Sequence, residues 1–467
     1  MRSNVLWLVL DTARRDAFEP YGAAAGSSPA VSDLARRGVA HEEVHAAGCW
    51  TVPSHAAMFT GLLPRAAGLG DAPGGSPFGC KPVLEAQRDR LLPEVMRRAG
   101  YATAGVTTNL WIDTGGGFTT GFDDWVSVRT TRQEAMGADT LRVRLGWARQ
   151  ALRAQVDDGA AEAGRVMRGW AGDPPRRPFF WFANLIECHS PYLPPKPWND
   201  LGALDRVRAA SEARRHLTLS EIWKSCVGGF DVPEDALARM RHLYKRAIRS
   251  MDGWLEELLD ALDRASLLDD TLVIVTSDHG ENFGEGGLMG HALSLDERLV
   301  HVPFVAAGPG AEAFEGMRSL VELPRRVAAA VGLEEHPWHD DLPEDVAVAQ
   351  FDAIVPPGDP RVDEALEKWG LPADAGARLT TPLTAATDGR LKLLRRGVNE
   401  ELYDLAADPL ELDPLAAVGH DGAVDRLRAA LEHPAVIAER PPESTPTDVP
   451  ADEMEQLEAQ MRLLGYL

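Results

Sequence analysis

Short runs of consecutive apolar residues recur along the chain, and each run ends at a polar turn. Apolar positions without polar alternation indicate strands that are covered on both faces, as in a parallel sheet between two layers of helices. We expect such strands at Val5–Leu10, Tyr101–Val106, Phe179–Leu185, Leu272–Val275 and Val302–Ala306.

Stretches with apolar residues at helical spacing lie between these runs, at Leu91–Ala99, Gly137–Met167 and Asp235–Ala265. The last of them carries its apolar residues on one stripe and its charges elsewhere, which indicates packing against a core. Strand runs and helices in alternation predict an α/β fold with a large, mostly parallel central sheet flanked by helices.

Two further segments depart from this alternation. Residues 191–230 are punctuated by Pro and Gly, and we expect them to be irregular, either as a lid or as an ordinary surface insertion. Asp388–Leu394 and Glu400–Leu405 predict a hairpin of a small antiparallel sheet. We therefore expect a catalytic domain at 1–380, a small C-terminal antiparallel subdomain at 381–440, and a Pro-rich linker with a closing helix at 441–467.

The composition narrows the choice of partners and compartment. The 48 Lys and Arg against 71 Asp and Glu give a net charge of −23, which argues against nucleic acid or an anionic membrane as the main partner. The four cysteines form no CxxC pair and no dense framework, which favours reduced thiols in a cytoplasmic protein. One small anion in a local cleft remains compatible with the acidity, and the sequence does not indicate an oligomeric state.

Asp278 and His279 follow the run Thr271–Thr276, at the point where a strand is expected to end. Open α/β sheets bind ligands at this edge, and a carboxylate beside an imidazole is a plausible half of a divalent-metal site. Asp-His-Gly also makes a good turn, which is the simpler interpretation. Asp11 follows the first expected strand and would lie at the same edge of a parallel sheet.

Thr51 precedes a predicted helix that has Pro53 in its first turn and ends before Gly61. Free N–H groups and the dipole at a helix N-terminus favour negative charge. A hydroxyl at this position, beside a divalent ion, can ionise and attack phosphorus or sulfur. The alternative is that Thr51 only caps the helix.

Taken together and in order, many short motifs resemble the sulfatase family of the alkaline phosphatase superfamily, over most of the chain. The similarity is carried by Asn4–Arg14, Asp16, Tyr21-Gly22, Thr51–Gly61, Gly100–Gly105, His189–Tyr192, Thr276–Glu281, Gly284-Glu285, His291, His301–Pro303, Gly308–Gly310, Asp388–Arg390, Glu401–Leu405, Asp408-Pro409 and Leu463–Tyr466.

The resemblance implies a role for each matching residue. Asp11, Asp278 and His279 would bind one divalent metal ion, with Thr51 as a further ligand and as the nucleophile. His189 and His291 would hold the anionic group or help the leaving oxygen to depart. The residues implied to contact the substrate are Asn109, His55 and Arg14.

The chain departs from the family at the nucleophile. Sulfatases make a formylglycine from Cys or Ser in the pattern Cys/Ser-x-Pro-x-Arg, whereas here Thr51 occupies that position and His55 the Arg position, with Cys49 two residues too early. A branched Cβ prevents formation of the aldehyde, so no formylglycine is expected. Thr12 replaces the second Asp of many sulfatases, which leaves a site that would accept Mn, Mg, Ca or Zn.

These observations predict a metal-dependent hydrolase that cleaves a small anionic phosphate ester, either a mono- or a diester, through Thr51. Three alternatives stay open at this point. They are a sulfate-ester hydrolase that works without formylglycine, a transferase that passes the phospho group to an alcohol, and a non-catalytic binding protein.

Overall fold

The computed structural model describes residues 2–70, 79–128, 149, 152–154, 157–291, 293–339, 341–353, 355–415 and 421–439. Its centre is a seven-stranded sheet in the order β2-β9-β6-β1-β5-β3-β4. The strands are β1 (Asn4–Leu10), β2 (Gly38–Ala40), β3 (Ala102–Thr107), β4 (Asp124–Ser127), β5 (Phe179–Leu185), β6 (Thr271–Thr276) and β9 (Phe304–Ala307).

The four pairings at the centre of the sheet are parallel, from β6 through β1, β5 and β3 to β4. The expectation of a mostly parallel sheet is therefore confirmed. The run at 302–306 is an exception, because β9 pairs antiparallel with β6, and β2 pairs antiparallel with β9. An antiparallel neighbour is also buried on both faces here, so its apolar pattern does not distinguish it from a parallel strand.

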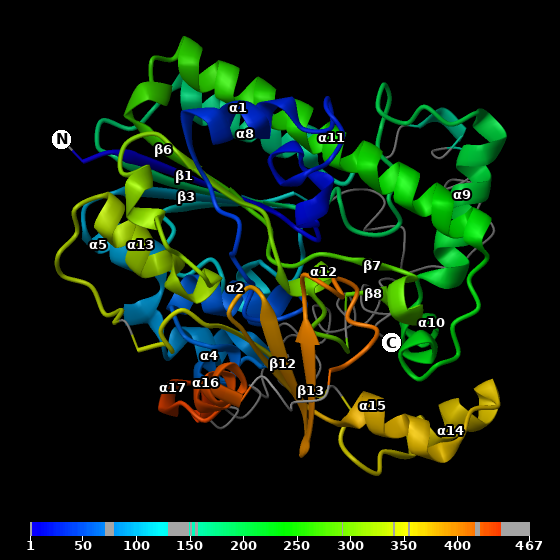
Figure 1. Ribbon diagram of the computed structural model, residues 1–467. Coiled ribbons are helices and arrows are strands. Elements are labelled where there is room, and N and C mark those ends of the chain that lie inside the picture. Colours follow the sequence, from blue (N-terminus) through cyan, green and yellow to red (C-terminus); the bar gives the residue numbers. More distant parts are fainter. Residues whose placement is uncertain are drawn as a thin grey trace.

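Helices cover both faces of this sheet, as Figure 1 shows. One layer contains α1 (Pro29–Arg37), α8 (Ala160–Gly172) and the long α11 (Glu234–Arg264), and the opposite layer contains α2 (Thr51–Thr60), α4 (Cys80–Glu85), α5 (Leu92–Arg98) and α13 (Leu323–Ala330). The helix predicted at Gly137–Met167 is found from Ala160 onward, whereas residues 137–148 lie outside the described residues.

Alternate side chains of β1 enter different halves of the core. Trp7 packs with Phe59 of α2 and with Phe182 of β5 in one half, whereas Leu6 and Leu8 belong to the other half. Trp7 is fully buried, and truncating such a side chain to alanine typically costs about 3–5 kcal/mol of stability. This packing fixes β1 between its neighbours and thereby fixes the position of Asp11 at its end.

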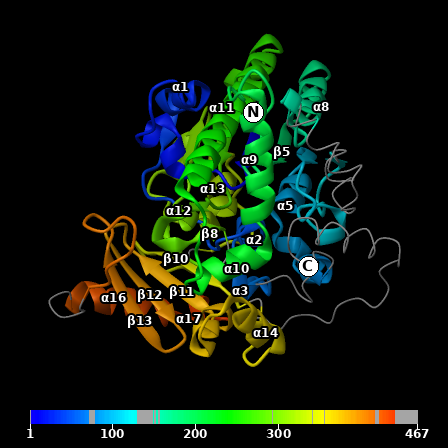
Figure 2. The same cartoon turned by 90° about the vertical axis from the view of Figure 1, so that its right-hand side faces the viewer.

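The expectation that residues 191–230 are irregular is wrong over their second half. This part contains α9 (Ala203–His216) and α10 (Leu219–Cys226), which lie at the right-hand side of Figure 1 and face the viewer in Figure 2. The Pro residues of this segment lie before α9 and the Gly pair 228–229 follows α10, so these residues border the helices instead of interrupting them.

A four-stranded antiparallel sheet lies beside the main sheet in the order β10-β11-β12-β13. Its strands are β10 (Ala347–Phe351), β11 (Leu383–Thr387), β12 (Leu391–Arg396) and β13 (Asn399–Asp404), and α16 (Asp421–Leu431) packs on it. The predicted small antiparallel sheet is thus present, but β10 precedes the boundary proposed at residue 380. The predicted linker and closing helix at 441–467 lie outside the described residues.

The remaining elements are short. The main domain also contains α3 (Pro64–Ala67), α12 (Glu297–Val300) and a two-stranded sheet of β7 (Asn282–Phe283) and β8 (Met289–Gly290). The C-terminal part also contains α14 (Pro360–Trp369), α15 (Ala377–Thr380) and α17 (Pro434–Ile437).

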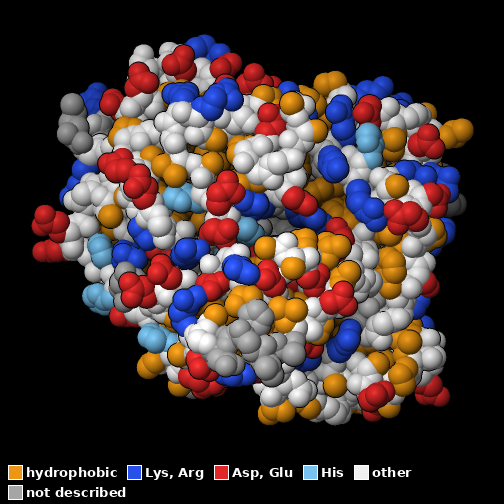
Figure 3. Space-filling model, viewed as in Figure 1, with side chains coloured by type: hydrophobic (Ala, Val, Ile, Leu, Met, Phe, Trp, Pro, Cys, Tyr) orange, Lys and Arg blue, Asp and Glu red, His pale blue; other side chains and the backbone are white. Residues whose placement is uncertain are grey.

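No helix in the described part of the chain combines the length and the apolar character needed to cross a membrane. Figure 3 shows acidic and basic side chains interspersed over one face, so the negative charge is spread on that face and not concentrated.

Candidate metal centre and active site

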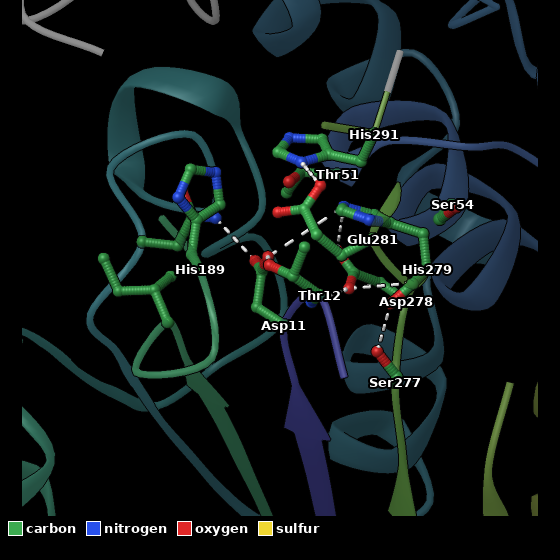
Figure 4. Close-up of polar contacts among 12 residues, drawn as sticks. Asp11, Thr12, Thr51, Ser54, His189, Ser277, Asp278, His279, Glu281 and His291 are labelled. Carbon is green, nitrogen blue, oxygen red and sulfur yellow. Dashed lines mark hydrogen bonds and ion pairs between the residues drawn. The ribbon is translucent and has the colours of Figure 1, made fainter. Parts of the chain in front are cut away.

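The strands β1 and β6 end side by side and bring Asp11, Asp278 and His279 together. In this register Val9 pairs with Thr276, so Asp11 and Asp278 leave the sheet at the same edge. All three side chains are fully buried, and their ligand atoms lie within 4.8 Å of one another. His279 Nε2 lies 3.4 Å from Asp278 Oδ2 and 3.9 Å from Asp11 Oδ1, as Figure 4 shows.

The hydrogen bonds of this cluster leave two ligand atoms free. His279 Nδ1 lies 2.9 Å from the carbonyl oxygen of Gly280, which can only accept, so Nδ1 carries the proton and Nε2 presents its lone pair. His279 Nε2 and Asp278 Oδ2 are buried and have no hydrogen-bond partner among the residues that the structure describes. Buried polar atoms are rarely left unpaired, and two of them facing one space fit a bound cation.

The charges of the cluster lead to the same conclusion. Burial and the nearby Asp11 carboxylate raise the pKa of Asp278 well above its ordinary value. Burial also opposes ionisation of Asp11, but the neighbouring His279 and His189 lower the pKa of Asp11. Burial and His291 lower the pKa of His279 well below its ordinary value, so its ring is neutral. A divalent cation would let both carboxylates ionise, and the donor set of two oxygens and one nitrogen fits such an ion.

Thr12 orients both carboxylates. Its hydroxyl donates to Asp11 Oδ1 at 2.9 Å, and its backbone N–H donates to Asp278 Oδ1 at 3.2 Å. Thr12 has a φ of 65°, which is unusual for a β-branched residue, and the Tyr244 hydroxyl holds its carbonyl at 2.8 Å. The second Asp that many sulfatases have at this position is thus replaced by a residue that positions ligands.

Thr51 is the first residue of α2, after Trp50 in an extended conformation. Every residue of α2 is buried, so the N-terminal N–H groups of this helix lie inside the protein. The ring of His55 connects Thr51 to the metal cluster, because His55 Nδ1 lies 2.9 Å from the Thr51 carbonyl oxygen and 3.4 Å from Asp278 Oδ2. Figure 4 draws Thr51 together with the cluster.

Asn184 fixes the protonation of His55. His55 Nδ1 lies 2.9 Å from the Thr51 carbonyl oxygen, which can only accept, and Asn184 Nδ2 donates to His55 Nε2 at 3.2 Å. His55 Nε2 is therefore an acceptor, and Nδ1 carries the proton toward the Thr51 carbonyl. Burial lowers the pKa of His55 to about 4, although Asp11 opposes this change, so the ring is neutral at pH 7.

His189 and His291 lie on the other side of the cluster. The His291 ring stacks on His279 with centroids 4.6 Å apart, and the His189 ring meets His291 edge-on at 4.9 Å. His291 Nδ1 lies 3.2 Å from Glu281 Oε1. Burial alone would lower the pKa of His291, but the Glu281 carboxylate offsets burial and raises it. This contact also orients the ring, because the Tyr192 hydroxyl donates to the other oxygen of Glu281 at 2.7 Å.

The other two residues expected to contact the substrate have protein partners. Asn109 donates to Asp11 Oδ2 at 2.7 Å, so it orients a ligand of the metal cluster. The Arg14 guanidinium binds Asp16, Glu285 and the Glu281 carbonyl, which occupy all three of its nitrogens. This geometry gives Arg14 a role in supporting the Glu281 segment and does not favour contact with a substrate.

Sequence inspection missed Asn184, Glu281 and Tyr192 as site residues. The sequence does contain an indication of Asn184, because it is the one amide side chain in the otherwise apolar run of β5. The indication of Glu281 is weaker and consists of its place at the end of the Ser277–Glu281 motif. Tyr192 has a φ of 54°, which no sequence pattern indicated.

Comparison with known proteins identifies the family of this chain. The chain matches the Sulfatase family over residues 3–333. It is 31% identical to the choline-sulfatase of Rhizobium meliloti over 260 residues, which are 52% of this chain and 47% of that protein. The alignment thus spans about half the length of that relative.

Solved structures share the fold over nearly the whole chain. The phosphonate monoester hydrolase of Agrobacterium radiobacter gives a TM-score of 0.61 at 21% identity, and the match covers 92% of this chain and 94% of that one. A 2-O GAG sulfatase gives a TM-score of 0.64 at 16% identity, with 92% and 91% covered. The family match covers the sheet, α2 and every residue of the metal cluster, and the chain belongs to the Sulfatase family.

Proposed function

We propose that this protein is a metal-dependent hydrolase that cleaves a phosphate mono- or diester with Thr51 as its nucleophile. The observation that carries the proposal is an unmodified threonine at the buried N-terminus of α2, connected through His55 to the Asp11, Asp278 and His279 cluster. Threonine cannot form the aldehyde on which sulfatases depend. A covalent ester on Thr51 would therefore be released by attack at phosphorus or sulfur, and this route suits phosphorus better.

Asp11, Asp278 and His279 would hold one divalent ion, with Thr51 completing the set. When bound, such an ion lowers the pKa of a neighbouring hydroxyl and stabilises negative charge that develops on oxygen. Two carboxylates and one nitrogen suit Mn²⁺, Mg²⁺ or Zn²⁺ better than Ca²⁺, which prefers more oxygen ligands.

The residues of the chain would then act in two steps. In the first, Thr51 Oγ1 releases its proton to solvent water and forms a bond to phosphorus, the ester P–O bond breaks, and His291 or His189 gives a proton to the departing oxygen. In the second, water attacks phosphorus and gives a proton back to that histidine, the Thr51–phosphorus bond breaks, and Thr51 Oγ1 takes a proton from solvent water. A monoester then leaves as phosphate and a diester as a phosphate monoester. Helix α2 contributes free N–H groups near the transferred group.

One rival has a specific observation in its favour. The relative from Rhizobium meliloti is named a choline-sulfatase, which keeps a sulfate-ester hydrolase as the second candidate. The solved relative from Agrobacterium radiobacter is named a phosphonate monoester hydrolase, which supports phosphorus as an alternative centre on this fold. We also propose a reducing, cytoplasmic compartment, supported by four buried cysteines that are all present as thiols.

The test is an ester panel with the metal-loaded protein. Aryl phosphate, phosphodiester, phosphonate monoester and aryl sulfate are compared for the wild type, Thr51→Ala and Thr60→Ala, a control at the other end of α2. We expect the phosphorus esters to be cleaved at least about 100-fold faster than the sulfate, and Thr51→Ala to lose about 10³-fold or more. A Thr51→Ala protein with full activity would remove Thr51 from the mechanism, and faster cleavage of the sulfate would favour the rival.

A further inference from the structure

A second cluster of metal-ligating side chains lies outside the residues described so far. His45 is in the segment between β2 and α2, and Glu297 and His301 stand at the two ends of α12. The ligand atoms of these three residues lie within 4.8 Å of one another. Glu297 Oε2 is 3.0 Å from His45 Nε2 and 3.3 Å from His301 Nδ1. Ligand atoms around a tetrahedral Zn²⁺ are about 3.3 Å apart, given bond lengths of about 2.0–2.1 Å.

The contacts of His301 require a positive charge between its ring and Glu297. His301 Nε2 lies 2.6 Å from the carbonyl oxygen of Glu42, which can only accept, so this nitrogen carries the proton. In the neutral ring Nδ1 then presents a lone pair to Glu297 Oε2 at 3.3 Å. Two lone pairs face each other there, and either a proton or a metal ion must lie between them.

His45 is arranged to share that ion. Its ring stacks on the His301 ring with centroids 4.6 Å apart and planes 15° apart, so both rings approach Glu297 from one side. His45 Nε2 lies 3.0 Å from the same oxygen of Glu297 that His301 faces, so an ion bound to that oxygen would be within reach of both rings.

Lys392 leaves one oxygen of Glu297 for a cation. Lys392 Nζ binds Glu297 Oε1 at 3.0 Å and Glu411 Oε2 at 2.8 Å. Oε2 of Glu297 is the oxygen that Lys392 does not bind, and it is the oxygen that faces His45 and His301. Glu297 and His301 are 12% and 18% exposed at their side chains, which gives an ion a path from solvent.

We propose that His45, Glu297 and His301 form a binding site for a Zn²⁺-class transition metal ion, separate from the Asp11 cluster. Two nitrogens and one carboxylate oxygen select such an ion over Ca²⁺ or Mg²⁺, which prefer oxygen ligands. The ion would tie α12 and the segment before α2 to β12 of the small sheet, through the Glu297–Lys392 ion pair. The Lys392 contact would orient the Glu297 carboxylate, as partners of metal ligands commonly do.

The experiment counts zinc equivalents bound by the full chain after equilibrium dialysis, measured by elemental analysis. We expect His301→Gln and His45→Gln each to bind one equivalent fewer than the wild type, while cleavage of the preferred ester stays within about twofold. His242→Gln is the control, because His242 also contacts a carboxylate, Asp200 at 2.7 Å, in a pair without a second histidine. Circular dichroism checks that each variant is folded.

Cobalt substitution gives a readout that does not depend on activity. The wild type with Co²⁺ should show visible d–d absorption from this site that both variants lack, and Asp278→Asn should keep it. Equal zinc uptake by the wild type and the two variants would overturn the proposal and assign the His45–Glu297–His301 contact to protons alone. The Asp278→Asn variant changes only the Asp11 cluster. A negative result for the His45–Glu297–His301 site can therefore be distinguished from a negative result for the proposed function.

Discussion

Asn184 Nδ2 lies 3.2 Å from Nε2 of His55, and this contact makes Nε2 an acceptor, so the imidazole carries its proton on Nδ1. The consequence reaches Thr51, because the protonated Nδ1 faces the Thr51 carbonyl oxygen at 2.9 Å. The same nitrogen lies 3.4 Å from Asp278 Oδ2. An amide in a buried strand thus orients the first turn of the helix that carries the proposed nucleophile.

Asn184→Asp should reverse this arrangement. A carboxylate accepts but does not donate, so His55 would place a proton on Nε2, and a neutral ring would then turn a lone pair toward the Thr51 carbonyl. Losing this contact in a buried site costs about 1–3 kcal/mol, which corresponds to a fall in kcat/KM of about 10–100-fold. Nitrogen-15 NMR of the imidazole should show the proton on Nδ1 in the wild type and on Nε2 in Asn184→Asp. Unchanged tautomer and unchanged kcat/KM would contradict this role.

Asn109→Ala should weaken metal binding more than substrate binding. Asn109 donates to Asp11 Oδ2 at 2.7 Å, and outer partners of metal ligands typically contribute about 10–100-fold to metal affinity. We therefore expect a metal titration to show that Asn109→Ala binds the metal about 10–100-fold more weakly than the wild type. At saturating metal, the KM of the variant should be close to that of the wild type. A raised KM with unchanged metal affinity would instead support the direct contact with substrate that the family resemblance implies.

Lys392→Met should destabilise the chain strongly. Lys392 is buried between Glu297 and Glu411, and removing one partner of a buried ion pair typically costs about 3–5 kcal/mol. Urea unfolding at pH 7 measures the loss, and Glu411→Gln in the same chain should recover part of it. Lys224→Met is the control, since Lys224 binds the exposed Asp231 at the surface and should change stability little. A loss below about 1 kcal/mol for Lys392→Met would contradict the expectation.

The strands and the positions of Asp11 and Asp278 at one edge of the sheet could be predicted because each depends on a local pattern. Unbroken apolar runs locate β1, β5 and β6 to within one residue, and a polar residue after β1 and after β6 locates Asp11 and Asp278. The antiparallel direction of β9 could not be predicted, because a strand buried on both faces has the same apolar pattern in either direction.

The supporting contacts depend on residues far apart in the chain. Asn184 and His55 are separated by 129 positions, and Asn109 and Asp11 by 98, so no local spacing relates them. Asn109 reaches Asp11 because β3 ends one strand away from β1 across β5, and its predicted contact with substrate is not related to this pairing. His45 lies 252 residues from Glu297, and its pairing is visible only once α12 is folded against the segment before α2.

Glu94→Gln should lower stability at neutral pH, and the loss should disappear in acid. Burial alone would raise the pKa of Glu94, but hydrogen bonds from Arg97, Arg88 and Arg98 lower it from 4.5 to about 2. A depressed pKa gives stability that is complete above 4.5 and is lost as the pH falls from 4.5 through about 2. Because the three guanidinium groups are 38–55% exposed, we expect about 1–2 kcal/mol at pH 7.

Urea unfolding of the wild type and Glu94→Gln at pH 7, 5, 4 and 3 measures the Glu94 contribution. The difference between the two proteins should be constant from pH 7 to 5 and shrink below pH 4.5 as the Glu94 carboxylate binds a proton in the unfolded chain. Glu162→Gln is the matched control, because Glu162 also pairs with an arginine, Arg165, but is exposed, and its substitution should change stability little. A difference that stays the same at pH 3 would mean that the cost of Glu94→Gln comes from packing and not from charge.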